Sequence, residues 1–326
     1  MSLIDNSYLE KKIKIWYKEK FQKKIDSISL LSGGQSNLCY LINNNYVLKV
    51  YKPKYSYAKK DQEKYFDTAR EFQPKLNKSG FTPKITQVYV DDDILEANVI
   101  LMEYIAGKDL SITLSKCSED FKFNTGQEIG SILKAIYQSE TISNQSYNTQ
   151  ELLDTTKRHL AIAIERGVIP QNILIKSQEY IDNYIPRNIS EDFVLVHGDA
   201  HLENFIKQQS KLFVIDFDLC SMALAFFETR MLLHLAFMPA NLVSEELEIY
   251  YPEGSMLILV SGVIESYPEI LPHKYFSEIK LIALTEILGK FDLDESVVDR
   301  IIPIRRASFM FDQIFNQSAL ENLLNH

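Results

Sequence analysis

The sequence predicts an α+β fold in which a small sheet-containing part precedes a larger helical part. Residues from about 27 to 103 contain short β-rich runs separated by turns, with one helical segment among them. Beyond Gly107 the apolar residues recur mostly at helical spacing. Two short apolar runs, Phe193–Val196 and Leu212–Asp216, interrupt this helical part and bracket a polar cluster. These observations predict two domains, with a polar site in the second.

The first domain is expected to begin with an amphipathic helix over about 5–24. Three antiparallel strands should follow between 27 and 52, separated by a Gly-Gly turn and an Asn-Asn-Asn turn. A helix over roughly 56–78 comes next, and Pro74 should kink or shorten it. Two further strands within 84–105 flank a turn of three aspartates.

The second domain is expected to be mainly helical. The last strand of the first domain meets a glycine and then Asp109, which can start a helix, so we place the domains at 1–104 and 105–326. Helices are predicted near 124–139, 150–166 and 171–185, with several more after about 221.

Composition excludes several classes of protein. The net charge of -9 disfavours general nucleic-acid binding, and three cysteines without CxxC spacing suit a reducing compartment. The N-terminal residues lack the apolar core of a signal peptide, and no run of about 18 apolar residues occurs. We therefore expect a cytoplasmic protein that binds neither nucleic acid nor membrane.

Charge is unevenly distributed along the chain. Residues 1–100 hold 17 Lys and Arg against 12 Asp and Glu, whereas residues 101–326 hold 18 against 32. This distribution indicates either a solvated acidic surface or a first domain that faces an anion and a second that receives a cation.

The polar cluster contains oxygen donors at the ends of predicted strands. Asp199 and Asn204 lie five residues apart on the loop after the first apolar run, and Asp216 ends the second run. Carboxylate and amide oxygens that converge on one point suit Mg²⁺ better than zinc. Because protein-bound Mg²⁺ usually accompanies phosphates, we expect a phosphate site elsewhere in the chain.

A glycine turn in the first domain is one candidate for that phosphate site. Its backbone N–H groups can approach a phosphate without an intervening Cβ. The residues expected to bind are Ser32, Gly33, Gly34 and Ser36.

Lys49 is the second candidate. It alternates in phase with Val47 and Tyr51, which predicts a buried-face lysine that needs an anionic partner. Phosphate oxygens could serve, with Glu71 or Glu63 of the following helix to hold the ammonium in place.

Taken in order, these parts resemble a known family. The loop reads "HGDAHLEN" over 197–204 and is followed by "VIDFD" over 214–218. This pair is similar to the H-G-D-x-H-x-x-N and I-D-F hallmarks of the aminoglycoside phosphotransferase and choline kinase-like family. The resemblance runs from the glycine turn to at least residue 235, and the ordered parts match a phosphoryl-transfer site of the protein-kinase type.

The resemblance implies a bilobal protein-kinase-like fold and a role for each matching residue. Asp199 would be the catalytic base, and Asn204 and Asp216 would hold Mg²⁺. Lys49 would contact the α- and β-phosphates, with Glu71 as its expected partner. The backbone groups of Glu103 and Ile105 would bind the adenine edge.

The activity implied is transfer of the γ-phosphate of ATP or GTP to a hydroxyl group of a small molecule. The acidity of the second domain suits a cationic acceptor such as an aminoglycoside, choline, another amino alcohol or an amino sugar. Neutral sugars and homoserine remain alternatives, since they are substrates in the same family.

Some residues fit the family pattern less well. The segment after "VIDFD" lacks the usual glycine and offers only Glu228 near the place of a later aspartate, so we expect Glu228 to support the catalytic loop. His197 is expected to be a buried structural histidine. His201 and Asp218 have several possible roles, including a contact to the metal, and their assignment stays open.

The sequence leaves two alternative functions. A protein kinase is disfavoured because no segment ends in Ala-Pro-Glu, and a pseudokinase because the four expected catalytic and binding groups are intact. A metal-dependent phosphohydrolase is suggested by the i, i+4 spacing of His197 and His201. Two observations argue against it. Gly198 stands where a helical zinc motif has its glutamate. "DFD" over 216–218 resembles the D-x-D motif of phosphatases, but that motif normally opens its domain, whereas Asp216 is two-thirds along the chain.

Overall fold

The structure is a computed structural model that describes residues 6–31, 37–51, 62–114, 117–236, 256–291, 307–316 and 319–324. It forms two compact units. The first comprises Met1–Lys108 and Asn204–Cys220, and the second comprises Asp109–Glu203 and Ser221–His326. The units differ from the predicted domains, because residues 204–220 pack with the first unit although the chain enters them from the second.

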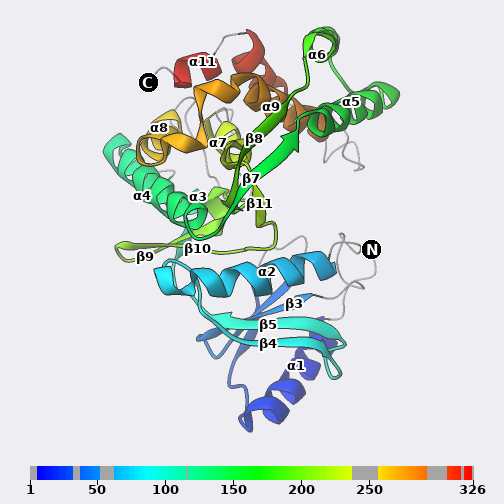
Figure 1. The fold of residues 1–326 in the computed structure, drawn as a ribbon. Coiled ribbons are helices and arrows are strands. Elements are labelled where there is room, and N and C mark those ends of the chain that lie inside the picture. Colours follow the sequence, from blue (N-terminus) through cyan, green and yellow to red (C-terminus); the bar gives the residue numbers. More distant parts are fainter. Residues whose placement is uncertain are drawn as a thin grey trace. The chain divides into compact units, whose positions relative to one another are not determined.

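The first unit is built on a five-stranded antiparallel sheet with the order β1-β2-β3-β5-β4. One helix covers each face of this sheet (Figure 1). The elements are α1 (Asn6–Phe21), β1 (Ile28–Leu30), β2 (Leu38–Ile42), β3 (Tyr46–Tyr51), α2 (Gln62–Leu76), η2 (Asn77–Ser79), β4 (Ile85–Asp92) and β5 (Ala97–Glu103). The five predicted strands are confirmed, and α2 ends two residues after Pro74.

The two faces of the sheet have separate cores. On the α1 side, Trp16 packs among Leu48, Val50 and other apolar strand residues, and its Nε1–H donates to Asp92 Oδ2 at 3.0 Å. On the α2 side, Tyr51 packs against Phe66. Because side chains alternate along a strand, Lys49 shares the α2 side with Tyr51, as the sequence predicts.

A second small sheet brings the segment after the "HGD" loop into the first unit. Strands β9 (Phe205–Gln208) and β10 (Lys211–Val214) form a hairpin, and β6 (Lys108–Asp109) lies beside β9. The backbone N–H of Val214 donates to Phe81 O at 2.9 Å. This hydrogen bond fixes the end of β10 beside the chain that follows α2.

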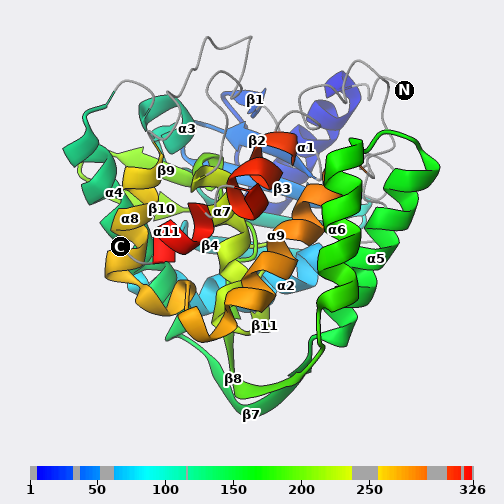
Figure 2. The ribbon, with the colours of Figure 1, turned by 90° about the horizontal axis from the view of Figure 1, so that it is seen from above.

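The second unit is mainly helical. Its helices are α3 (Leu110–Thr113), α4 (Glu119–Tyr137), α5 (Gln150–Glu165), α6 (Gln171–Asn183), α7 (Thr229–Ala236), α8 (Leu257–Ser266), α9 (Phe276–Phe291) and α11 (Ala319–Leu324). Short turns of other helix types are η4 (Leu202–Asn204, at the unit boundary), η5 (Ala225–Glu228), η6 (Pro268–Ile270), η7 (His273–Tyr275) and η8 (Asp312–Asn316). Helices α5 and α6 lie side by side next to α9 (Figure 2).

Close helix packing in this unit depends on glycine. A Cβ on Gly126 of α4 would lie 2.0 Å from the carbonyl oxygen of Leu259 in α8, and one on Gly262 of α8 would lie 2.2 Å from Phe123 O. Any larger residue at either position would push the two helices apart. Helices α4 and α8 are therefore held at close range by these two glycines.

The second unit also contains a three-stranded sheet with the order β11-β8-β7, formed by β7 (Thr141–Asn148), β8 (Asn188–Val196) and β11 (Ser221–Ala223). The end of β8 is the predicted strand Phe193–Val196. Strand β7 was not predicted, because its sequence is polar and most of its residues are exposed. Among the described residues no helix is long and apolar enough to cross a membrane.

Candidate active site

Lys49 is the centre of a charged cluster in the first unit. It lies in β3, opposite Cys39 of β2 and Ile100 of β5, and is buried. Its Nζ lies 2.7 Å from Asp216 Oδ1 and 2.8 Å from Asp218 Oδ2. Burial lowers the pKa of Lys49, but the two carboxylates outweigh burial and hold that pKa well above its usual value.

Asp218 is the buried member of the two aspartates. Its Oδ2 accepts a hydrogen bond from Asn37 Nδ2 at 2.5 Å, and its Oδ1 accepts one from the Tyr51 hydroxyl at 2.8 Å. Burial raises the pKa of Asp218 to about 6, although Lys49 opposes this shift. The role of Asp218 was left open by the sequence, and here its carboxylate binds three side-chain donors.

Asp216 and Asn204 lie next to each other through a backbone hydrogen bond. The N–H of Ile215 donates to Asn204 O at 2.9 Å, so the residue before Asp216 is fixed to the end of η4. Asp216 has φ of 65°, which is uncommon for a residue other than glycine and marks a constrained backbone. The backbone therefore keeps Asn204 close to the residue that precedes Asp216.

The second unit holds the "HGD" loop immediately after β8. Gly198 has φ of 78°, which favours glycine at this position. The backbone N–H of His197 donates to Glu228 Oε2 at 2.6 Å, and that of Gly198 donates to Glu228 Oε1 at 3.3 Å. Burial raises the pKa of Glu228 to about 7, while both of these hydrogen bonds oppose the shift.

The histidines of the loop have different surroundings. His197 is fully buried, and its Nδ1 accepts a hydrogen bond from the Asp199 N–H at 3.2 Å, which agrees with the structural role expected for it. His201 Nε2 lies 3.4 Å from Asp199 Oδ2, and its Nδ1 lies 3.9 Å from Glu203 Oε2. His201 is therefore a neighbour of the expected base.

Comparison with known proteins decides the family. The family model described as "Phosphotransferase enzyme family" matches residues 27–251, which is more than two thirds of the 326 residues. The chain belongs to this family. It is a phosphotransferase, and the family predicted from the "HGDAHLEN" and "VIDFD" motifs is confirmed. No curated protein sequence matches the chain significantly.

Solved structures of phosphotransferases have the same fold. ADP-bound aminoglycoside phosphotransferase APH(2'')-Ib is 18% identical, with a TM-score of 0.57 over 94% of this chain and 98% of that chain. The GDP and kanamycin complex of APH(2'')-IIIa is 14% identical, with a TM-score of 0.57 over 97% and 98%. Choline kinase from Cryptosporidium parvum Iowa II is 10% identical, with a TM-score of 0.55 over 99% of both chains. The predicted kinase-like fold is thereby confirmed.

Arg230 is a residue of this phosphotransferase that the sequence analysis missed. Its Nη2 donates to Gly198 O at 2.6 Å, and its Nη1 lies 3.5 Å from Glu286 Oε1. Arg230 therefore binds the carbonyl oxygen of Gly198, the residue whose N–H donates to Glu228. Its position two residues after Glu228 was the only signal in the sequence.

Glu71 does not lie at Lys49 in this structure. Its carboxylate is exposed and pairs with Lys75 Nζ at 3.3 Å, and Glu63 is exposed on the same helix. The expected pairing of Lys49 with a glutamate of α2 is therefore replaced by pairing with two aspartates. The physical reason is the orientation of α2, which turns its acidic residues to solvent.

The remaining expected nucleotide contacts lie at the end of β5 and in the glycine turn. Glu103 ends β5, and its N–H donates to Lys84 O at 2.9 Å. The N–H of Ile105 makes no hydrogen bond with the described residues, so it is available to a ligand. The glycine-turn residues Ser32, Gly33, Gly34 and Ser36 lie outside the described residues.

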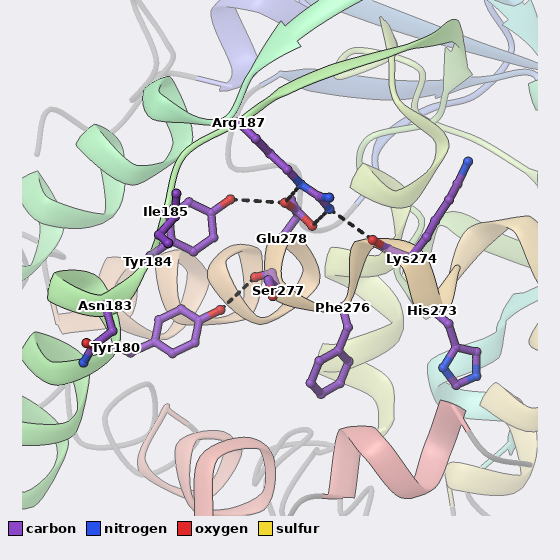
Figure 3. Close-up of a pocket in the computed structure, with 10 residues that line it drawn as sticks. All are labelled: Tyr180, Asn183, Tyr184, Ile185, Arg187, His273, Lys274, Phe276, Ser277 and Glu278. Carbon is purple, nitrogen blue, oxygen red and sulfur yellow. Dashed lines mark hydrogen bonds and ion pairs between the residues drawn. The ribbon is translucent and has the colours of Figure 1, made fainter.

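The second unit also contains a cavity of about 550 Å³ between α6 and the start of α9 (Figure 3). Arg187 forms a two-point ion pair with the buried Glu278, with Nε–Oε1 of 2.6 Å and Nη2–Oε2 of 2.7 Å. The charge of Glu278 is thus neutralised, so the cavity does not suit a cationic acceptor. The cavity also lies at the start of β8, whereas His197 follows the end of this strand. A strand of nine residues is roughly 30 Å long, so the cavity is far from the "HGD" loop. We therefore do not assign this cavity to the acceptor of the phosphate.

Proposed function

We propose that this phosphotransferase moves the γ-phosphate of ATP or GTP to a hydroxyl group of a small, cationic molecule. The observation that carries this proposal is the 2.7 Å contact between Lys49 Nζ and Asp216 Oδ1, two residues 167 positions apart. A buried ammonium suits nucleotide phosphates, and an aspartate beside it suits the metal ion that accompanies them.

Asn204 and Asp216 would hold Mg²⁺ in this proposal. The donor set fits, because Mg²⁺ usually takes one or two protein oxygens and completes its shell with water and phosphate oxygens. The exposed side of Asp216 leaves room for such ligands. When bound, the ion supplies neutralisation of the charge that develops on the phosphate oxygens.

Asp199 is proposed as the base. Its carboxylate would accept the proton of the acceptor hydroxyl while that oxygen forms a bond to the γ-phosphorus and the bond to the departing nucleoside diphosphate breaks. Glu228 binds the N–H of Gly198 and Arg230 binds its C=O, so the backbone of the residue before Asp199 is held on both sides. Such positioning is the main contribution a protein makes to this reaction.

The nucleotide base is proposed to bind at the end of β5. The N–H of Ile105, which has no partner among the described residues, and the backbone of Glu103 would offer a donor and an acceptor to the edge of a purine. Related structures are described as ADP, GDP and ATP complexes of those proteins. The same backbone groups can serve adenine or guanine, so both nucleotides belong in the test.

A cationic acceptor is proposed because of the charge of the chain after residue 100, where 32 acidic residues face 18 basic ones. Related structures are named as gentamicin and kanamycin complexes of their own proteins, and another is a choline kinase. A cytoplasmic location is part of the proposal, because Cys39, Cys117 and Cys220 are all free thiols.

A coupled assay of nucleoside diphosphate release tests the proposal. ATP and GTP would each be offered with aminoglycosides, choline, other amino alcohols, amino sugars, methylthioribose and homoserine. We expect Mg²⁺-dependent release with at least one amine acceptor and its loss in Asp199→Asn. Phosphorylation of the protein itself, or hydrolysis of phosphate esters without nucleotide, would contradict the proposal.

A further inference from the structure

The lysine that is expected to bind phosphate needs a permanent carboxylate partner, and α2 does not supply one. The buried face of α2 consists of Gln62, Phe66, Ala69, Phe72, Gln73 and Leu76, none of which is acidic. The acidic residues Glu63, Asp67 and Glu71 are on exposed positions. An unpaired buried ammonium is costly, so another element must hold Lys49.

Two aspartates contact Lys49, but only one of them is enclosed. The Asp216 side chain is 41% exposed, whereas that of Asp218 is 7% exposed. Asp216 can therefore exchange Lys49 for another cation at little cost. Asp218 would have to leave a buried position to do the same.

Asp218 is also held by two neutral donors, one just before β2 and one in β3. Asn37 precedes β2 and directly follows the glycine turn in sequence, and Tyr51 ends β3, two residues from Lys49. Both donate to the carboxylate of Asp218, at 2.5 and 2.8 Å. Together with Lys49 they give the carboxylate three donors from the sheet, which fixes its position.

We propose that Asp218 is the positioning residue that holds Lys49 for the nucleotide phosphates, in place of a glutamate from α2. This proposal rests on the proposed function, because it assigns Lys49 to phosphate and Asp216 to metal. When Asp216 takes a metal ion, Asp218 keeps the ammonium of Lys49 in place. The hydrogen bond from Asn37 also connects Asp218 to the residue that follows the glycine turn in sequence.

A double-mutant cycle tests this role. Asp218→Asn, Lys49→Met and the double variant would be compared by calorimetric binding of Mg·ATP and Mg·GTP and by kcat and KM for the nucleotide. We expect each single variant to bind nucleotide about 10- to 100-fold more weakly, the range for loss of one charged hydrogen bond. The double variant should bind no more weakly than Lys49→Met, because Asp218 acts through Lys49.

Asp92→Asn is the matched control. Asp92 is a buried aspartate of the same unit that also pairs with a lysine, Lys20 at 3.2 Å, and with the Trp16 indole. Its substitution should lower thermal stability as much as Asp218→Asn does and leave nucleotide affinity within about twofold. Glu71→Gln should leave both unchanged.

The outcomes separate the two proposals. Additive losses in the cycle, or a loss of affinity in Asp92→Asn equal to that in Asp218→Asn, would overturn the positioning role alone. A loss of affinity in Glu71→Gln as large as in Asp218→Asn would do the same. Failure of the unsubstituted protein to bind either nucleotide would overturn the proposed function and the positioning role together.

Discussion

The charged cluster at Lys49 and the loop at Asp199 are both anchored by a buried carboxylate, but in different ways. Asp218 binds side-chain donors from neighbouring strands, so it fixes an ammonium group. Glu228 binds the backbone N–H groups of His197 and Gly198, so it fixes the path of the chain. Asp218 therefore controls the position of the Lys49 ammonium, and Glu228 controls the backbone from which the Asp199 carboxylate projects. Substitutions should therefore affect ligand affinity at one site and loop structure at the other.

Among substitutions at the Lys49 cluster and at the "HGD" loop, Asp216→Asn should have the largest effect on turnover. The substitution removes a charge from the expected metal site, so turnover should fall by roughly 10²- to 10³-fold, as for loss of one charge-stabilising group. Because the Asp216 side chain is 41% exposed, the melting temperature should change little. Calorimetry with and without Mg²⁺ checks the cause, and an equal loss of binding without Mg²⁺ would contradict a metal role.

Glu228→Gln should act on stability and on its pH dependence. The folded carboxyl has a pKa raised to about 7 from 4.5, so the folded state binds this proton more tightly than the unfolded state does. The free energy of unfolding should therefore fall between about pH 4.5 and pH 7, by on the order of 3 kcal/mol.

The glutamine variant cannot titrate and should lack that fall. Urea unfolding at several pH values measures the difference between wild type and variant, which isolates Glu228 from other groups such as Asp218. A difference that does not change with pH would show that Glu228 is ionised in the folded protein throughout this range.

Arg230→Met should have a smaller effect. The variant loses the hydrogen bond to Gly198 O and keeps most of the apolar stem, so turnover should fall by about tenfold, equivalent to one hydrogen bond of roughly 1.4 kcal/mol. The nucleotide KM should remain unchanged, since the residue supports the loop. Steady-state kinetics can separate these constants, and a change confined to KM would mean that Arg230 acts on the nucleotide.

Glu71→Gln should have the smallest effect. Glu71 pairs with Lys75 at the surface, and such i, i+4 pairs contribute about 0.3–0.5 kcal/mol. Activity should stay within about twofold of the unsubstituted protein. A loss of activity beyond tenfold would mean that Glu71, and not Asp218 alone, acts on Lys49.

The site residues that the sequence predicts are those whose evidence is local. The spacing of Asp199 and Asn204 on one loop, the aspartate after the next strand, and the alternation of Lys49 with Tyr51 can each be seen within a few residues. The family motifs then joined these segments. They could be predicted because each depends on the backbone period or on a short contiguous pattern.

Other features depended on contacts between distant parts of the chain. Asp218 lies 169 residues after Lys49, and no local pattern distinguishes it from Glu71 as the lysine's partner. Arg230 binds a carbonyl oxygen 32 residues earlier, and β7 is a polar strand that exists only because it pairs with β8. Residues 204–220 pack with the first unit for the same reason, since β10 bonds to Phe81.

The role of Asp199 as the base is tested by the effect of Asp199→Asn on phosphate transfer and on nucleotide binding, measured on the same preparation. Once an acceptor is identified, the transferred phosphate can be followed by ³¹P NMR and nucleotide affinity by calorimetry. We predict that transfer falls by about 10²- to 10⁴-fold, the range for loss of a general base, while affinity for the Mg²⁺-nucleotide stays within about twofold. Transfer that remains within tenfold of the unsubstituted protein would contradict the assignment of Asp199 as the base.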